Sequence, residues 1–87
     1  MNNNERRLRY RCWHRGTREA DLLMGNFFDK CFFSLTEKEK LLFNDFVEET
    51  KDTDLVYYTM KIKAWPEYLP SRIIEIYEDY INKEKLK

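Results

Sequence analysis

The fold is decided at a short corner that reads Arg15-Gly16-Thr17-Arg18-Glu19, preceded by Trp13-His14 and followed by Ala20-Asp21. Gly16 is one of only two glycines in the 87 residues, and it separates two segments rich in helix-forming residues. Glycine adopts a positive φ at little cost, so it can end one helix and turn the chain into the next. The sequence therefore predicts a turn between two helices here, and the charged side chains around it suggest a contact surface.

Apolar periodicity predicts a helix on each side of this corner. The first extends from about Asn4 to Arg15, with Leu8, Cys12 and Arg15 on one face and Gly16 just past its end. The second follows Thr17 as its N-cap, with Glu19 in the first turn. Its apolar stripe repeats every three or four residues and comprises Ala20, Leu23, Met24, Phe27, Phe28 and Cys31. Gly25 inside this stripe is expected to mark a kink or a tight helix crossing.

Three further helices are predicted in the rest of the chain. The third opens with a capping box of Thr36 and Glu39, or alternatively Ser34 and Glu37, and buries Leu42, Phe43, Phe46 and Val47. The run Lys51-Asp52-Thr53-Asp54 is interpreted as a turn that ends in an N-cap. A short helix then covers Asp54 to Lys61, because a lone strand would have no partner.

A loop with two prolines separates that short helix from the last one. The last helix begins at Pro70 or Ser71, and its inner face comprises Ile73, Ile74, Ile76, Tyr77, Tyr80 and Ile81. We expect the ends, residues 1–4 and 83–87, to be frayed. The sequence thus predicts an all-α protein, a compact five-helix bundle that forms a single small domain over residues 1–87.

The charge is balanced overall but unevenly distributed. Residues 1–18 hold six arginines against Glu5 alone, and the remainder carries the opposite excess, so the formal net charge is zero. Such asymmetry can steer an acidic or phosphorylated partner to one end, although a solvated helix face would look the same. No apolar run approaches the roughly 20 residues of a membrane span, and the N-terminus lacks a secretory h-region. We therefore expect a cytoplasmic, bacterial protein with reduced cysteines and no membrane partner.

Few residues of this sequence could serve as catalytic groups or metal ligands. His14 is the only histidine, and Cys12 and Cys31 are not spaced as a metal site, so we expect no metal. Cys12 and His14 point to different sides of a helix, which disfavours a nucleophile pair. Arg15 and Glu19, four residues apart, could form an ion pair across the bend. That pair is either a surface ion pair beside a glycine cap or an exposed polar docking site, and Trp13 either anchors an interface or covers the end of the core.

The run from Trp13 to Phe27 closely resembles the succinate dehydrogenase assembly factor family, the small flavinators of bacteria and mitochondria. The family signature is Arg-Gly-x-x-Glu, here Arg15, Gly16 and Glu19, followed by Asp21; the acidic turn Asp52-Thr53-Asp54-Leu55 is a second similar stretch. The resemblance spans roughly residues 6–66. Two features depart from it: Tyr58 stands where the family often has a tryptophan, and a later glycine is absent near Lys61 and Lys63.

The resemblance implies an assembly factor that binds the flavoprotein subunit of succinate dehydrogenase, or in some bacteria of fumarate reductase. It promotes covalent attachment of FAD to that subunit and holds no cofactor of its own stably. It places partner binding on Arg15, Gly16 and Glu19, with Arg11, Arg18, Asp21 and Asp52 at the rim; Trp13 and His14, which precede the signature, complete the expected partner-binding set. We expect no enzymatic activity and a monomer when free.

Two alternatives remain open from the sequence. Glu19 could act directly as a proton-transfer group in flavin attachment, which would make the protein a catalyst. Otherwise the chain could be a small helical interaction or nucleic-acid-binding protein, of antitoxin type, that uses its arginine-rich first helix. The zero net charge and the acidic remainder argue against nucleic acid as a partner.

Overall fold

The computed structural model describes residues 1–85, with side chains through residue 83, and its regular elements are all helical. The elements in chain order are α1 (Asn3–Trp13), α2 (Arg18–Cys31), the 3-10 helix η1 (Phe32–Ser34), α3 (Glu37–Glu49), α4 (Asp52–Thr59) and α5 (Ser71–Lys85). No strand occurs in residues 1–85. The prediction of an all-α protein with five helices is therefore confirmed.

Side-chain caps start three of these helices. Asn2 and Glu5 form a capping box at α1, and Thr36 and Glu39 form the predicted one at α3. The Thr17 hydroxyl accepts from the Ala20 N–H at the start of α2, as the sequence predicts. The alternative capping box of Ser34 and Glu37 does not form, because the Ser34 hydroxyl donates to the carbonyl of Cys31, the N-cap of η1.

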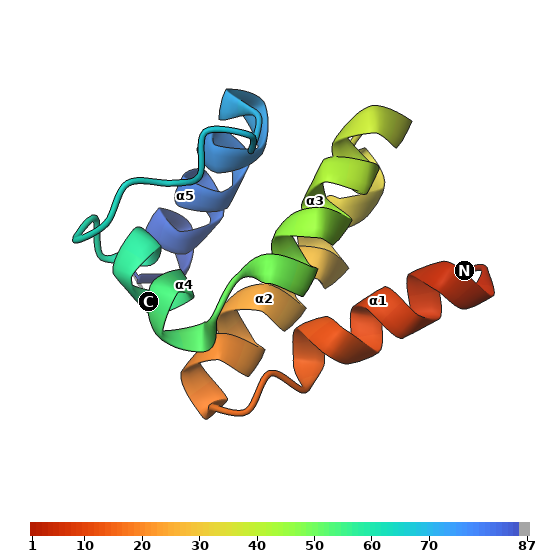
Figure 1. The fold of residues 1–87 in the computed structure, drawn as a ribbon, viewed down its shortest axis with the longest axis horizontal. Coiled ribbons are helices and arrows are strands. Elements are labelled where there is room, and N and C mark those ends of the chain that lie inside the picture. The colour runs from red at the N-terminus through yellow and green to blue at the C-terminus, as the bar shows by residue number, and fades with distance from the viewer. Residues whose placement is uncertain (86–87) are drawn as a thin grey trace.

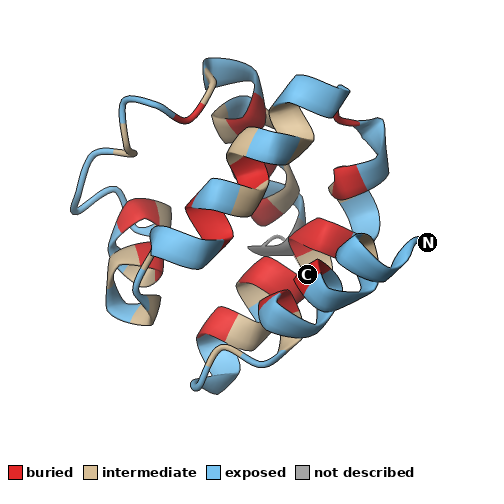
Figure 2. Cartoon of the chain, turned by 45° about the vertical axis from the view of Figure 1, so that its right-hand side comes forward, coloured by how far each residue is buried: buried red, intermediate tan, exposed pale blue. Residues whose placement is uncertain are grey.

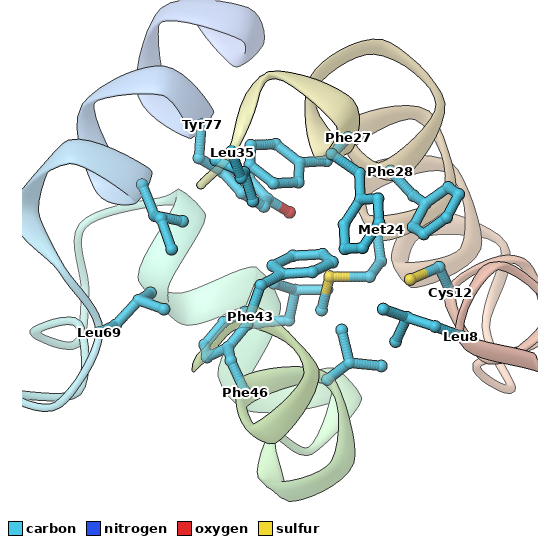
Figure 3. Packing of buried hydrophobic residues seen from close by; sticks show 14 of the residues in the cluster. Leu8, Cys12, Met24, Phe27, Phe28, Leu35, Phe43, Phe46, Leu69 and Tyr77 are labelled. Atoms are coloured by element: carbon cyan, nitrogen blue, oxygen red, sulfur yellow. The ribbon is translucent and has the colours of Figure 1, made fainter. Parts of the chain in front are cut away.

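The core lies where α2, α3 and α5 meet, with α1 and α4 closing its sides (Figure 3). The predicted stripe of α2 supplies Met24, Phe27 and Phe28, all fully buried. Phe27 lies between two rings from other helices, with centroid distances of 5.2 Å to Phe43 and 4.6 Å to Tyr77. Such aromatic pairs add to the stabilisation that burial itself gives. Figure 2 shows buried residues on the sides of the helices that face one another and exposed residues on the outside.

Three boundaries differ from the sequence prediction. The run from Lys51 to Asp54 is not a turn that precedes α4: Lys51 is the N-cap, and the helix already begins at Asp52. The same helix ends at Thr59 and not at Lys61. The first helix ends at Trp13, so Arg15 lies outside it rather than on its buried face. α5 begins at Ser71, one of the two predicted starts, and extends to Lys85; residues 86–87, at the end of the segment expected to be frayed, lie outside the described part of the chain.

The arrangement of these helices brings two connections to one end of the molecule. Figure 1 shows the link between α1 and α2 beside the junction of α3 and α4, and hydrogen bonds join the two. The longer loop from α4 to α5 lies apart from them. The Arg-Gly-x-x-Glu corner therefore lies against a second helix junction instead of standing alone in solvent.

Candidate functional site: the corner between α1 and α2

The corner is a turn of four residues, from His14 to Thr17, and a side chain of α2 holds it. Gly16 has φ of 124°, a conformation that residues with a side chain rarely adopt, so the predicted need for glycine is confirmed. The Asp21 carboxylate in the first turn of α2 accepts a hydrogen bond from the Arg15 backbone N–H. A Cβ on Gly16 would lie 3.2 Å from the Asp52 Oδ2 atom of α4. The turn is thus both conformationally restricted and closely packed.

The Arg15 guanidinium binds the neighbouring helix junction. Its Nε donates to the Asp52 Oδ1 at 3.0 Å, one terminal nitrogen donates to the Val47 carbonyl at 2.7 Å, and the other donates to the Thr50 carbonyl. Only 8% of its side-chain surface is exposed. The two carbonyls belong to the C-terminal end of α3, where carbonyl groups lack partners within the helix. Arg15 therefore caps α3 and holds the start of α4 at the same time.

This geometry corrects two expectations. The predicted ion pair between Arg15 and Glu19 is wrong, because the turn at Gly16 directs Arg15 towards α3 and α4 while Glu19 is exposed in the first turn of α2. The Arg15 guanidinium is also not an exposed polar docking group. Its three acceptors are 32 to 37 residues away in sequence, two of them backbone carbonyls, so no local sequence signal identifies them.

The exposed part of the corner consists of other residues. His14, Gly16, Thr17, Arg18 and Glu19 are all exposed. Arg18 has no ion pair within residues 1–83, whereas Arg11 pairs with Glu48 at 2.6 Å on the surface. Asp21 and Asp52 are both partly buried behind this surface, held by Arg15. A ligand that reaches the corner from outside would therefore meet the His14 ring, the bare Gly16 backbone, and one cation and one carboxylate on α2.

Trp13 is engaged inside the molecule. Its ring lies so close to Gly25 of α2 that a Cβ there would be 2.2 Å from the Trp13 Cδ2 atom. Its Nε1 donates to Asp29 at 3.3 Å, and the same carboxylate accepts two hydrogen bonds from Arg9. The glycine in α2 thus marks a tight helix crossing, which is one of the two outcomes predicted for it. Trp13 contributes to the site by fixing α1 on α2.

A shallow hollow of about 550 Å³ opens beside the corner. One wall is the ring pair of Tyr10 and His14, whose centroids are 4.0 Å apart at a tilt of 33°, and the other wall includes Lys51 and Thr53 at the start of α4. Neither Tyr10 nor Lys51 is among the site residues predicted from the sequence. The helical spacing of Tyr10 and His14 was the available signal for the first, whereas nothing local relates Lys51 to the corner.

Cys12 is completely buried, and burial raises the pKa of its thiol to about 12, opposite to the shift that makes a cysteine reactive. Within the described residues no group of three or more His, Cys, Asp or Glu side chains could hold a metal ion. None of the helices, over the residues searched, is long and apolar enough to cross a membrane.

The family model described as flavinator of succinate dehydrogenase matches residues 6–80, which includes the corner, the α3–α4 junction and most of α5. No curated protein and no solved structure matches the chain.

Proposed function

The chain belongs to the Sdh5 family, the flavinators of succinate dehydrogenase, and on that basis we propose that it docks on the flavoprotein subunit through the exposed corner between α1 and α2. The family role is flavinylation of succinate dehydrogenase. The flavoprotein of fumarate reductase is proposed as a second client. The protein acts as a monomer, and FAD is the client's cofactor.

The observation that supports this proposal is that one residue of the corner is structural while its neighbours are exposed. Arg15 is buried and fixes the turn, while Gly16, Arg18 and Glu19 face solvent on a rigid support. A site preorganised in this way loses little conformational freedom on binding. Gly16 lets a backbone approach closely, and the Arg18 guanidinium and the Glu19 carboxylate supply charged hydrogen bonds at its side. Trp13, Asp21 and Asp52 keep these groups in place.

The proposed mechanism is orientation of the client. By binding an immature flavoprotein, the corner stabilises the conformation in which the flavin and its acceptor side chain meet. The new covalent bond is then formed by groups of the client. Such a mechanism requires of this protein a stable shape and a fitting surface, and both are properties of the corner described above.

The test uses Glu19→Gln, which removes the charge but keeps the shape of an exposed side chain. Two readouts are measured in cells that lack the wild-type protein: covalent flavin on the client, by in-gel fluorescence, and capture of the client by the tagged variant. We expect both to fall together. Glu75→Gln, at an exposed position of α5, is the matched control and should leave both unchanged.

The possible outcomes separate docking from catalysis. If Glu19→Gln still captures the client but covalent flavin is lost, Glu19 takes part in the chemistry itself. If both readouts stay at the wild-type level, the corner is not the docking site. Substitution of Gly16 is less informative because its φ of 124° makes any side chain strain the fold as well as the surface.

A further inference from the structure

The arginines of the basic N-terminal segment fall into two groups. Three of them face the rest of the molecule and each pairs with a carboxylate: Arg9 with Asp29, Arg11 with Glu48 and Arg15 with Asp52. The other three, Arg6, Arg7 and Arg18, are exposed and have no ion pair within residues 1–83. The acidic residues up to residue 83 thus leave half of these arginines without an ion-pair partner.

Two of the unpaired arginines lie on the outward side of α1. Successive residues of a helix are about 100° apart, so Arg6, Arg7, Tyr10 and His14 share one side, opposite the buried Leu8 and Cys12. We call the first four residues the α1 face. Tyr10 is 64% exposed and its ring lies against the His14 ring at a tilt of 33°, so the face presents two cations beside a pair of rings. Figure 2 shows exposed residues along the outside of the helix next to the N-terminus.

The α1 face is continuous with the corner. His14 is both the last residue of the face and the C-cap of α1, and Gly16 follows two residues later. The hollow beside the corner extends this surface from Tyr10 and His14 to Lys51 and Thr53. A partner seated on the corner would therefore also reach the outward side of α1.

From these observations we propose that the α1 face is a second docking surface, which binds an acidic patch of the same flavoprotein client; this inference rests on the proposed function. The guanidinium groups of Arg6 and Arg7 bind carboxylates with two hydrogen bonds each, and Tyr10 and His14 supply contact area. The charge of the face acts mainly before contact, because it steers the two proteins into the correct orientation.

Protein carboxylates fit this face better than a nucleic acid does. A nucleic-acid backbone carries a regular row of phosphates and needs an extended basic surface. Here the unpaired cations are few, Glu19 lies at the exposed corner, and the chain beyond residue 18 has an acidic excess that repels a long polyanion. A compact acidic patch on a folded partner avoids that repulsion.

The experiment measures association of the full-length protein with the purified flavoprotein subunit that lacks covalent FAD, by stopped-flow at about 50 mM and about 300 mM NaCl. The variant is Arg6→Glu with Arg7→Glu. The control, Lys61→Glu with Lys83→Glu, makes the same change in net charge at exposed positions away from the face. We expect an association rate constant about tenfold lower for the variant at low salt, a smaller difference at high salt, and a change under about twofold for the control.

Each other outcome has a defined meaning. Equal association rates for the wild type and the variant, with the client bound, would overturn this inference and leave the corner proposal intact. Failure of the wild type to bind the flavoprotein would contradict both. A complex of the wild type with duplex DNA or RNA that the variant fails to form, with client association unchanged, would assign the face to nucleic acid instead. A thermal unfolding midpoint equal to that of the wild type serves as the folding check, because Arg6 and Arg7 have no intramolecular ion pair within residues 1–83.

Discussion

At the scale of single residues, Arg15 shows how a signature position can be buried and can hold the fold together. The sequence correctly predicts a turn at Gly16, since a positive φ is a local property that glycine favours. It does not predict where the Arg15 side chain goes, because the choice between Glu19 and Asp52 depends on how α3 and α4 pack against the corner. Local spacing favours the wrong partner, and tertiary packing decides.

We predict that Arg15→Ala lowers the free energy of unfolding by about 2–3 kcal/mol, because it leaves Asp52 and two helix-end carbonyls without their donor. Arg15→Lys keeps the charge but cannot reach three acceptors with one nitrogen, so its loss should be intermediate. Arg18→Ala, at an exposed position of the same corner, is the control and should change stability by under about 0.5 kcal/mol. Urea unfolding followed by circular dichroism measures all three. A stable Arg15→Ala protein would mean that the three hydrogen bonds contribute little to the fold.

At the scale of elements, the contact between α1 and α2 sets the position of the corner. Trp13 lies on Gly25, and Asp29 accepts hydrogen bonds from both Trp13 and Arg9. Apolar periodicity predicts both helices correctly, because each buries a stripe at helical spacing. It misplaces the start of α4 by two residues, because Asp52 and Asp54 are typical of turns as well as of a first helical turn, where they complement the helix dipole.

The contact between Trp13 and Gly25 predicts whether Gly25→Ala raises or lowers the stability of the protein. Alanine favours a helix over glycine by about 1 kcal/mol, yet Gly25→Ala should destabilise the protein by about 1–3 kcal/mol because the new Cβ would overlap the Trp13 ring. In a Trp13→Ala background the overlap disappears, so the same substitution should stabilise by up to about 1 kcal/mol. A double-mutant cycle in urea measures this coupling. Additive effects of the two substitutions would contradict the close packing of the ring on the glycine.

The α4–α5 loop gives a second case at this scale. Lys61 has φ of 60°, the left-handed conformation, in the region of Lys61 and Lys63 where the family resemblance leads one to expect a glycine. Tyr58, in place of the expected tryptophan, is buried and stacks on Trp65 with centroids 5.2 Å apart. Both departures from the family pattern are visible in the sequence, whereas the burial of Tyr58 and the positive φ of Lys61 are properties of the folded chain.

At the scale of the whole molecule, one hydrophobic core rich in aromatic residues connects the five helices. The sequence predicts its members well: Phe27, Phe28, Phe43, Phe46 and Tyr77 are all buried. It predicts the corner as a contact surface but not its buried support, since that support comes from residues about thirty positions away. The uneven charge is visible in the sequence, whereas the division into paired and unpaired arginines is a property of the folded chain.

The buried core also predicts how stability depends on pH. Burial raises the pKa of Cys12 from 9.0 to about 12, and burial raises the pKa of Tyr77 as well. Between pH 9 and 12 the unfolded chain releases the Cys12 proton while the folded chain keeps it, so stability is full below pH 9 and falls as pH rises. The contribution of Cys12 alone should cost about 1.4 kcal/mol by pH 10.

Urea unfolding at pH 7 and pH 10, for the wild type and for Cys12→Ala, measures that contribution. The variant is less stable at both pH values because it loses a buried side chain, but it should lose less stability than the wild type on going to pH 10. An identical loss in the two proteins would show that another group governs the alkaline range.

The long sequence separation between Arg15 and its acceptors also determines when the corner can form during synthesis of the chain. A ribosome releases α1 and α2 first, and these helices can pack together through Trp13, Gly25 and Asp29 while the rest is still being synthesised. The acceptors of Arg15 follow much later, and Asp52 is the last of them. A growing chain therefore has the signature residues long before it has the finished corner. The proposed docking surface can therefore form only after more than half of the polypeptide has been synthesised.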